Sequence, residues 1–319
     1  MRKKQIIKNV TSFSIAFFLL FFISCFDESK KKSISHVIDY STDIDYSVDG
    51  KRLLISSIKN VIISHNLIDQ KSILLYQSKN LCQQAIYSND GKKIVFTEIY
   101  EGQHYSEIFI MNQEGGNVKQ ITFSKVFSGL PIFSKDDSKI YFIRKEKINY
   151  GFKYYSIELK NLIEKEISPK IVDVIGNHIL SEDSKSIYFV DFMANSANKK
   201  LVELNINTGN FRTIVENQEY LTPILQYNSI LLYGGCNFTI ENEFNKLIQK
   251  EIGIYTHNLL TQSHIFLFGI NWESLIKISR DKTKYIFLKS PGKIFEISAD
   301  GKNERQINID ESEIIGLMK

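Results

Sequence analysis

Residues 87–98 read YSNDGKKIVFTE. The Asp-Gly pair predicts a tight turn, because glycine adopts positive φ without steric cost and aspartate bonds to the backbone of such turns. The serine before the pair can also hydrogen-bond into the turn. A run of β-branched and aromatic residues follows at once, and such residues favour strands. The stretch therefore predicts two antiparallel strands joined by a short connection.

The same turn recurs along the chain. Its serines stand at positions 47, 88, 134, 181 and 279, with gaps of 41, 46, 47 and 98 residues. The last gap is twice 49, and residues 226–229 (QYNS) stand where a decayed sixth copy is expected. We predict that the turns are built by the following structural residues: Asp49, Gly50, Asp90, Gly91, Asp136, Asp183 and Asp281.

Each unit contains four short apolar runs bounded by turn residues. In the second unit these include KKIVFTE from Lys92, SEIFIMN from Ser106 and KQIT from Lys119. Four short strands repeated every 40–50 residues are typical of a propeller blade. The sequence thus predicts an all-β fold, a six-bladed β-propeller of four-stranded antiparallel blades, over residues 35–319. We expect residues 36–40 or 313–318 to supply a strand that joins the first and last blades.

The second blade, and the run IFEISADGKNERQIN from Ile294 in the sixth, resemble the repeat of the TolB-like propeller family. The resemblance covers about residues 40–310 and is weakest in the fifth blade. It implies the propeller fold and a periplasmic or other envelope setting. We do not transfer the partners of TolB itself to this chain.

The N-terminus predicts export. Residues 1–9 are basic, and residues 10–23 form an apolar stretch of 14 residues, which suits a signal peptide but is shorter than the roughly 20 residues of a membrane-spanning helix. Ser24 and Cys25 resemble the lipobox of bacterial lipoproteins, although Phe22 and Ile23 depart from its usual residues. We therefore expect a signal peptide at 1–24 and a lipidated Cys25 with a polar tether at 25–34. The alternative is an uncleaved membrane anchor.

Several classes of function are disfavoured. Outside residues 1–24 the chain has 36 basic and 36 acidic residues and no long basic cluster, so we expect no nucleic-acid partner. No Gly-x-Ser-x-Gly peptidase motif occurs. The six histidines lack metal-ligand spacing, and one turn aspartate per blade cannot supply a calcium shell. We expect no enzyme activity, cofactor or metal, and reduced, buried thiols at Cys82 and Cys236.

The connections between second and third strands give the functional hypothesis. They are long, dissimilar and aromatic-rich, and include residues 99–106, 145–155, 192–199 and 236–250. Loops on a rigid scaffold often carry binding residues, and aromatic side chains are favoured anchors. The predicted binding residues are Tyr100, His104, Tyr105, Tyr150, Phe152, Phe238 and Phe244. For any one of them, packing beneath its own loop is the alternative.

We therefore expect an envelope-anchored lipoprotein, lipid-anchored to a membrane with its propeller outside the cytoplasm, in the periplasm or at the cell surface. The propeller would be a non-catalytic binding or scaffold module for an envelope protein, peptide or glycan. The alternative is a propeller enzyme that acts on a glycan or peptide at the channel mouth. Converging carboxylates or a His/carboxylate pair would favour the enzyme.

Overall fold

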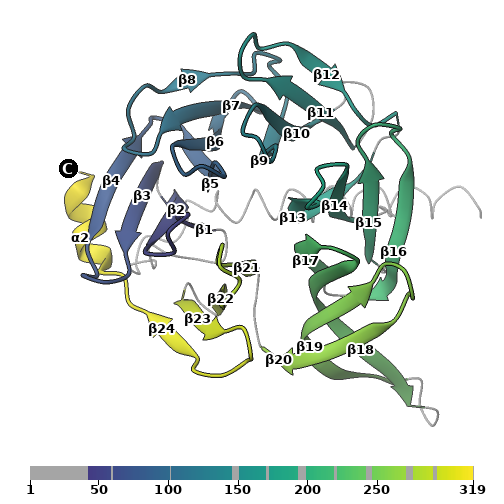
Figure 1. The fold of residues 1–319 in the computed structure, drawn as a ribbon. Helices are drawn as coiled ribbons and strands as arrows, with labels where there is room; N and C mark the ends of the chain where they lie inside the picture. The colour runs from purple at the N-terminus through teal and green to yellow at the C-terminus, as the bar shows by residue number, and fades with distance from the viewer. Residues whose placement is uncertain are drawn as a thin grey trace, which may run out of the picture. The chain divides into compact units, whose positions relative to one another are not determined.

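The described part of the chain is built from six four-stranded antiparallel sheets. A computed structural model describes residues 42–58, 60–100, 102–145, 151–169, 172–192, 199–218, 221–241, 246–270, 276–289 and 293–318. In every sheet the four strands are neighbours in sequence order, so each blade is a simple meander. The structure confirms the predicted six-bladed β-propeller (Figure 1).

The first three blades contain β1 (Asp43–Tyr46), β2 (Arg52–Ile58), β3 (Val61–Asn66) and β4 (Ser72–Gln77); β5 (Leu81–Tyr87), β6 (Lys93–Tyr100), β7 (Tyr105–Asn112) and β8 (Lys119–Gln120); and β9 (Ser128–Phe133), β10 (Lys139–Lys145), β11 (Phe152–Glu158) and β12 (Glu164–Glu166). The last three contain β13 (Val174–Leu180), β14 (Ser186–Asp191), β15 (Lys199–Asn205) and β16 (Phe211–Gln218); β17 (Leu221–Tyr227), β18 (Ile230–Glu241), β19 (Lys246–Asn258) and β20 (His264–Gly269); and β21 (Ile276–Ile278), β22 (Lys284–Lys289), β23 (Lys293–Ser298) and β24 (Arg305–Ile307). A short helix, α2 (Glu311–Leu317), follows the last strand.

The ring closes through its inner strands. The first strand of each blade contacts the first strands of both neighbours, including β21 and β1. Figure 1 shows these strands around the axis and the fourth strands at the rim. The expectation that residues 313–318 form a closing strand is wrong, because residues 313–317 belong to α2, which lies against β4, and Met318 is its C-cap. The alternative closing segment, residues 36–40, lies outside the described residues.

Side chains also join the first and last blades. The Tyr46 hydroxyl donates to Glu296 Oε2 across this junction at 3.3 Å. Burial and the Glu296 carboxylate both raise the pKa of Tyr46, so the phenol stays protonated and can donate. On α2, the Glu313 carboxylate accepts a hydrogen bond from the Ser72 backbone N–H of β4. The ring is therefore closed by packing and polar contacts among the described residues.

The hydrophobic core is divided among the six junctions between blades. Each of six buried clusters takes its residues from two adjacent blades. One cluster joins Ile44 and Leu53 of the first blade to Ile286 and Leu288 of the last. Because a sheet that is apolar on both faces must bury both, each blade needs two neighbours, and a closed ring supplies them.

The recurring turn has the same hydrogen bonds in five blades. In the second, Ser88 Oγ donates to Asp90 Oδ1 at 2.7 Å and accepts from the Lys93 backbone N–H at 2.9 Å. Equivalent serine–aspartate bonds of 2.6–2.7 Å occur at residues 47, 134, 181 and 279. The fifth blade instead has a two-residue turn after Tyr227, preceded by Gln226. Glu182 of the fourth blade donates its backbone N–H to Gln226 Oε1.

The residue three places after each turn serine adopts positive φ in all five blades. Gly50 and Gly91 occupy this position in the first two, whereas Asp137, Ser184 and Lys282 occupy it with φ of 56°, 59° and 62°. Non-glycine residues are strained there by about 1–2 kcal/mol. Asp137 offsets this strain, because its carboxylate accepts hydrogen bonds from the Asn89 and Asp90 backbone N–H groups of the preceding blade.

This difference predicts opposite effects of the same substitution. Ser184→Gly should raise the free energy of unfolding by up to about 1 kcal/mol, since it relieves positive-φ strain. Asp137→Gly should lower it by about 1–3 kcal/mol, because two backbone donors at the blade junction lose their acceptor. Urea unfolding followed by circular dichroism measures both. A loss of stability in Ser184→Gly would contradict the assigned strain.

The second-to-third connection of the fifth blade differs from the expectation. The sequence predicts a long loop over residues 236–250, but β18 and β19 continue through most of this range. Their pairing extends from Ile230↔Asn258 to Glu241↔Lys246. Strand β17 pairs only as far as Gly235 and β20 only as far as Gly253. The two strands therefore form a two-stranded arm beyond the four-stranded part of the blade.

Candidate functional site

The two faces of the propeller are built differently. On one face, which we call the turn face, each turn between third and fourth strands donates a backbone hydrogen bond to the turn between first and second strands of its own blade. This bond occurs in all six blades, for example from Leu67 N to Lys51 O and from Gln113 N to Lys92 O. The other face, the loop face, carries the second-to-third connections and the connections between blades. The two turns of each blade on this face are therefore bonded to each other. Backbone bonds such as Ser78 N to Asn60 O and Phe192 N to Asp173 O occur on the loop face as well.

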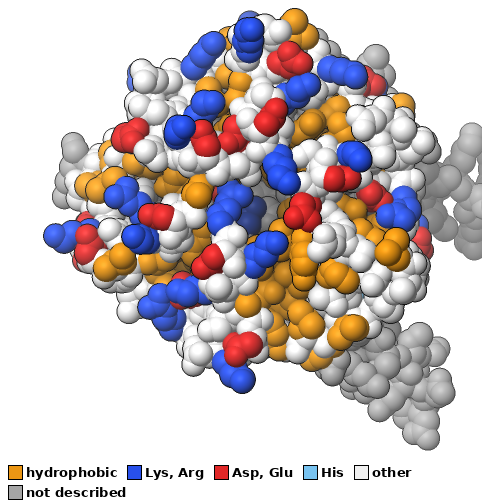
Figure 2. Space-filling view, viewed as in Figure 1, with side chains coloured by type: hydrophobic (Ala, Val, Ile, Leu, Met, Phe, Trp, Pro, Cys, Tyr) orange, Lys and Arg blue, Asp and Glu red, His pale blue; other side chains and the backbone are white. Residues whose placement is uncertain are grey.

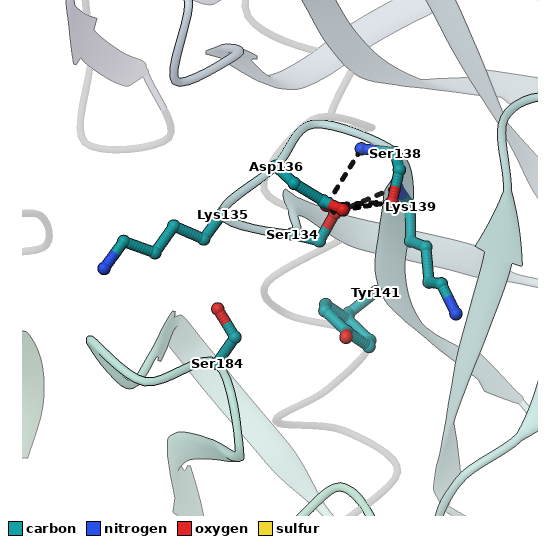
Figure 3. A pocket seen from close by; sticks show the side chains of 7 residues that line it. All are labelled: Ser134, Lys135, Asp136, Ser138, Lys139, Tyr141 and Ser184. Carbon is teal, nitrogen blue, oxygen red and sulfur yellow. Dashed lines mark hydrogen bonds between the residues drawn. The ribbon is translucent and has the colours of Figure 1, made fainter.

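A shallow pocket of about 380 Å³ lies on the turn face between the third and fourth blades (Figure 3). It is lined by Ser134, Lys135, Asp136, Ser138, Lys139, Tyr141 and Ser184. Its charged groups already have partners: Asp136 accepts from Ser134 and Ser138, and Lys139 pairs with Glu158 at 3.2 Å. Lys135 Nζ donates to the Glu182 carbonyl. These contacts explain the pocket as packing between two turns.

Two of the predicted binding residues stack on the loop face. Tyr100 ends β6 and Tyr105 begins β7, and their rings lie 4.6 Å apart with 22° between their planes. Both side chains are half-buried. His104, in the turn between them, is exposed and adopts φ of 57°. Tyr100 also packs against the buried cluster between the first two blades, so the stacked pair rests on the second blade with His104 exposed beside it.

Phe152 does not join the stacked pair. It is 6% exposed and makes an edge contact with Phe127 at 5.5 Å between ring centroids. Phe152 is therefore a core residue and not an exposed binding residue, since its ring packs beneath its own loop. Tyr150 and Phe244 lie outside the described residues, and of Phe238 the structure describes only the backbone in the β18–β19 arm.

A carboxylate pair that we did not predict lies on the loop face. Asp173 precedes β13, an inner strand, and its backbone N–H donates to Oδ1 of Asp191 at the end of β14. Burial, and next the Asp191 charge, raise the pKa of Asp173 to about 6. Burial also raises the pKa of Asp191, while the hydrogen bond from the Asp173 backbone N–H and, to a smaller extent, the charge of Lys200 oppose this shift. No motif marks this pair in the sequence, because its members come from opposite ends of a hairpin.

The pair predicts a pH effect with a defined sign. A carboxyl whose folded pKa is raised binds its proton more tightly in the folded state, so its contribution to stability is present below pH 4 and is lost as pH rises to 6. Asp173→Asn should remove this loss and make the protein more stable at pH 7. Thermal unfolding between pH 4 and 7 measures the effect. A variant with an unchanged pH dependence would contradict the assigned shift.

Asp136 provides the control of opposite sign. Hydrogen bonds from Ser134 and then Ser138 lower its pKa to about 2. Its contribution to stability is therefore present above pH 4 and is lost as pH falls through 2. Asp136→Asn should leave the slope between pH 4 and 7 unchanged while weakening the protein throughout that range. The two variants separate the specific effect of Asp173 from a general loss of charge.

Polar groups also face one another from the inner strands. Burial lowers the pKa of Lys277 on β21, and Asp45 and Asp43 on β1 oppose that shift. Asp43 Oδ2 accepts from the Gln84 backbone N–H and Asp45 Oδ2 from that of Tyr87, so these carboxylates also join the first two blades. Figure 2 shows Lys and Arg side chains gathered around a central depression, with acidic side chains among them. The side chains around the propeller axis thus include both basic and acidic groups.

A buried tyrosine–histidine pair lies between the third and fourth blades. The Tyr154 hydroxyl is 3.1 Å from His178 Nδ1. Burial, and to a smaller extent Lys277, lower the pKa of His178 to about 3, so the imidazole is neutral at pH 7. No hydrogen bond links this imidazole to Asp173 or Asp191 among the described contacts. The arrangement is therefore a polar core contact and not a His/carboxylate pair at a surface.

The cysteines, the expected absence of metal ligands and the predicted lipid site can also be compared with the structure. Cys82 is buried and free, in the second blade, and Cys236 belongs to the fifth. Among the described residues no group of three or more His, Cys, Asp or Glu side chains is placed to hold a metal ion. No described helix is long and apolar enough to cross a membrane. The predicted lipid site, Cys25, lies outside the described residues.

Protein-family models do not match this sequence, and neither do curated proteins. Solved structures do match. TolB from Acinetobacter baumannii superposes with a TM-score of 0.61 at 13% identity, over 83% of this chain and 63% of that protein. A putative TolB from Agrobacterium tumefaciens gives 0.56 at 15% identity, over 71% of this chain and 80% of the other. The chain has a TolB-like propeller fold.

The TolB-like propeller fold is shared by proteins of different function. An oligogalacturonate lyase in complex with manganese superposes with a TM-score of 0.55 at 14% identity, over 85% of this chain and 77% of that one. The match spans less than two-thirds of the Acinetobacter protein's own length. At such low identities the likeness concerns the fold, since one fold carries many sites.

Proposed function

We propose that this chain is an envelope-anchored lipoprotein whose TolB-like propeller is a non-catalytic binding module for a protein, peptide or glycan. The observation that carries the proposal is the aromatic pair on the loop face. The turns of the turn face are bonded to one another in every blade. The loop face presents the stacked Tyr100 and Tyr105 with the exposed His104.

The stacked tyrosines suit recognition in two ways. Aromatic rings bury a large area at small entropic cost and carry a hydroxyl that can bond to a polar partner. A pair already stacked is preorganised, so little freedom is lost on binding. A planar apolar surface edged by hydroxyls fits a peptide side chain or a sugar ring. The Asp173–Asp191 pair on the same face is the converging-carboxylate feature that would favour the enzyme alternative, so Asp173 is included in the test below.

The proposed anchor rests on residues 1–25. A basic start, an apolar stretch and a cysteine after Ser24 fit an exported, acylated chain. Acyl chains contribute about 0.8 kcal/mol per buried CH₂, so two or more would hold the protein on a membrane. Labelling with a clickable fatty acid should mark the wild type and not Cys25→Ser. Equal labelling of both would exclude acylation at this cysteine.

A face-specific capture experiment tests the binding module. Membranes from the native source would be solubilised, and partners captured on wild type, Tyr105→Ala and Tyr227→Ala. Tyr227 is 38% exposed and ends β17 at the turn face, so it is a matched control. We expect Tyr105→Ala to reduce capture about tenfold or more, as loss of an aromatic anchor does, and Tyr227→Ala to leave it unchanged.

The same experiment can contradict the proposal. Capture that is indifferent to Tyr105→Ala, or lost equally in Tyr227→Ala, would remove the assignment of the loop face. Cleavage of a glycan or peptide by the wild type and not by Asp173→Asn would replace the binding module with an enzyme. All variants would first be compared by thermal unfolding, so that loss of fold is separated from loss of binding.

A further inference from the structure

The outer strand of the fifth blade is an open apolar edge. Strand β20 lies at the rim (Figure 1) and, among the described residues, pairs on one side only, with β19. Ile265 is 60% exposed, Leu267 44% and Phe266 36%. Leu260, in the turn before the strand, is 81% exposed. Figure 2 shows hydrophobic side chains gathered over the region of this blade.

The outer strands of the other five blades are protected. Exposed strand edges are templates for pairing, and proteins blunt them with short length, charge or a covering element. Strand β8 has two residues, β24 three, and β12 is the charged tripeptide EKE. Strand β16 carries Arg212 and Glu216, each in an ion pair. Strand β4 is contacted by α2, and its Ser72 N–H is bonded to Glu313.

The charge pattern around β20 indicates which partner it fits. Residues 258–272 (NLLTQSHIFLFGINW) contain no Asp, Glu, Lys or Arg, although 24% of the chain is charged. A strand without charge can face an identical strand without like-charge repulsion. A charged partner segment would instead bury its charges against this edge at a cost. The complementary surface is therefore another uncharged apolar edge.

We propose that β20 pairs with β20 of a second copy of this chain, antiparallel and about a two-fold axis. Such a contact is isologous, so the same patch serves both copies. Because the remaining outer strands are protected, pairing ends at two copies and gives a closed dimer. Six residues per strand span about 20 Å. An interface of this length is small, so we expect a weak dimer with a dissociation constant in the micromolar range.

Sedimentation equilibrium of the full chain in a mild detergent, from about 1 to 100 μM, tests the dimer. The wild type should shift from monomer to dimer within this range. Ile265→Lys should weaken association at least about tenfold, since the ammonium group would meet the partner's apolar edge. The matched control is Ile73→Lys on β4, because Ile73 is 47% exposed on the outer strand that α2 protects. It should associate like the wild type.

Hydrogen exchange gives an independent readout. The backbone amides of residues 264–269 that point away from β19 should gain protection as concentration rises, and those of β12 should not. A wild type that stays monomeric at 100 μM, a dimer equally weakened by Ile73→Lys, or growth beyond two copies would each overturn the proposal. None of these results bears on the loop face, so the proposed function is tested separately.

Discussion

Replacing Phe189 by alanine should lower the free energy of unfolding by about 3–5 kcal/mol, as is usual for a fully buried phenylalanine. Phe189 on β14 is 0% exposed. Its ring lies 5.1 Å from that of Tyr154 in the preceding blade and 6.2 Å from that of Phe211 in its own. The substitution would leave a cavity at the junction that joins the third and fourth blades. Urea unfolding followed by tyrosine and tryptophan fluorescence measures the loss.

The control is Phe123→Ala. Phe123 lies in the segment that links the second blade to the third, and its side chain is 65% exposed. A surface substitution of this kind usually changes stability by less than about 0.5 kcal/mol. A cost below about 1 kcal/mol for Phe189→Ala would mean that the blades are held together by something other than the apolar clusters at their junctions. The comparison therefore tests whether the apolar clusters at the junctions hold the closed ring of blades together.

Gly115→Ala should cost about 3 kcal/mol or more, because it combines two penalties. Gly115 adopts φ of 87° in the turn between β7 and β8, where an L-residue costs about 1–2 kcal/mol. A Cβ at this position would also overlap the carbonyl oxygen of Leu75 on β4. Backbone cannot move aside as a flexible side chain does, so overpacking adds about 1–3 kcal/mol. Thermal unfolding would record a large fall in the midpoint.

Gly50→Ala isolates the conformational part of this cost. Gly50 has φ of 66°, and nothing lies within 4 Å of the position of its Cβ. It should therefore lose only about 1–2 kcal/mol. Equal losses at the two glycines would show that the first and second blades do not approach closely at Gly115. The difference between the variants measures that approach.

Much of the fold could be predicted from local pattern. The serine turn predicted both the number of blades and the position of each first hairpin, because it is a local device: Ser88 and Asp90 bond within their own turn. It also found the decayed fifth copy, where a turn follows Tyr227. Turn chemistry of this kind depends on four to six neighbouring residues and survives in the sequence.

The site was less predictable. Loop composition singled out Tyr100 and Tyr105 as candidates, but their stacking follows from their register across one hairpin, which the sequence did not reveal. Burial of Phe152 depends on Phe127, which arrives from the connection to the preceding strand. The Asp173–Asp191 contact likewise joins segments separated by a whole hairpin. Such encounters leave no spacing that a single sequence could reveal.

The sequence by itself determined the repeat, the strand order within each blade and the turn that starts every blade, because these depend on residues close together in the chain. Only the tertiary structure decided how the ring closes, which edges are protected and which are open. Residues 313–317 belong to a helix on β4 and not to a closing strand, while no described element covers the outer edge of β20. The physical reason is that burial is settled between blades: each blade has two apolar faces, and what covers them comes from neighbours distant in sequence.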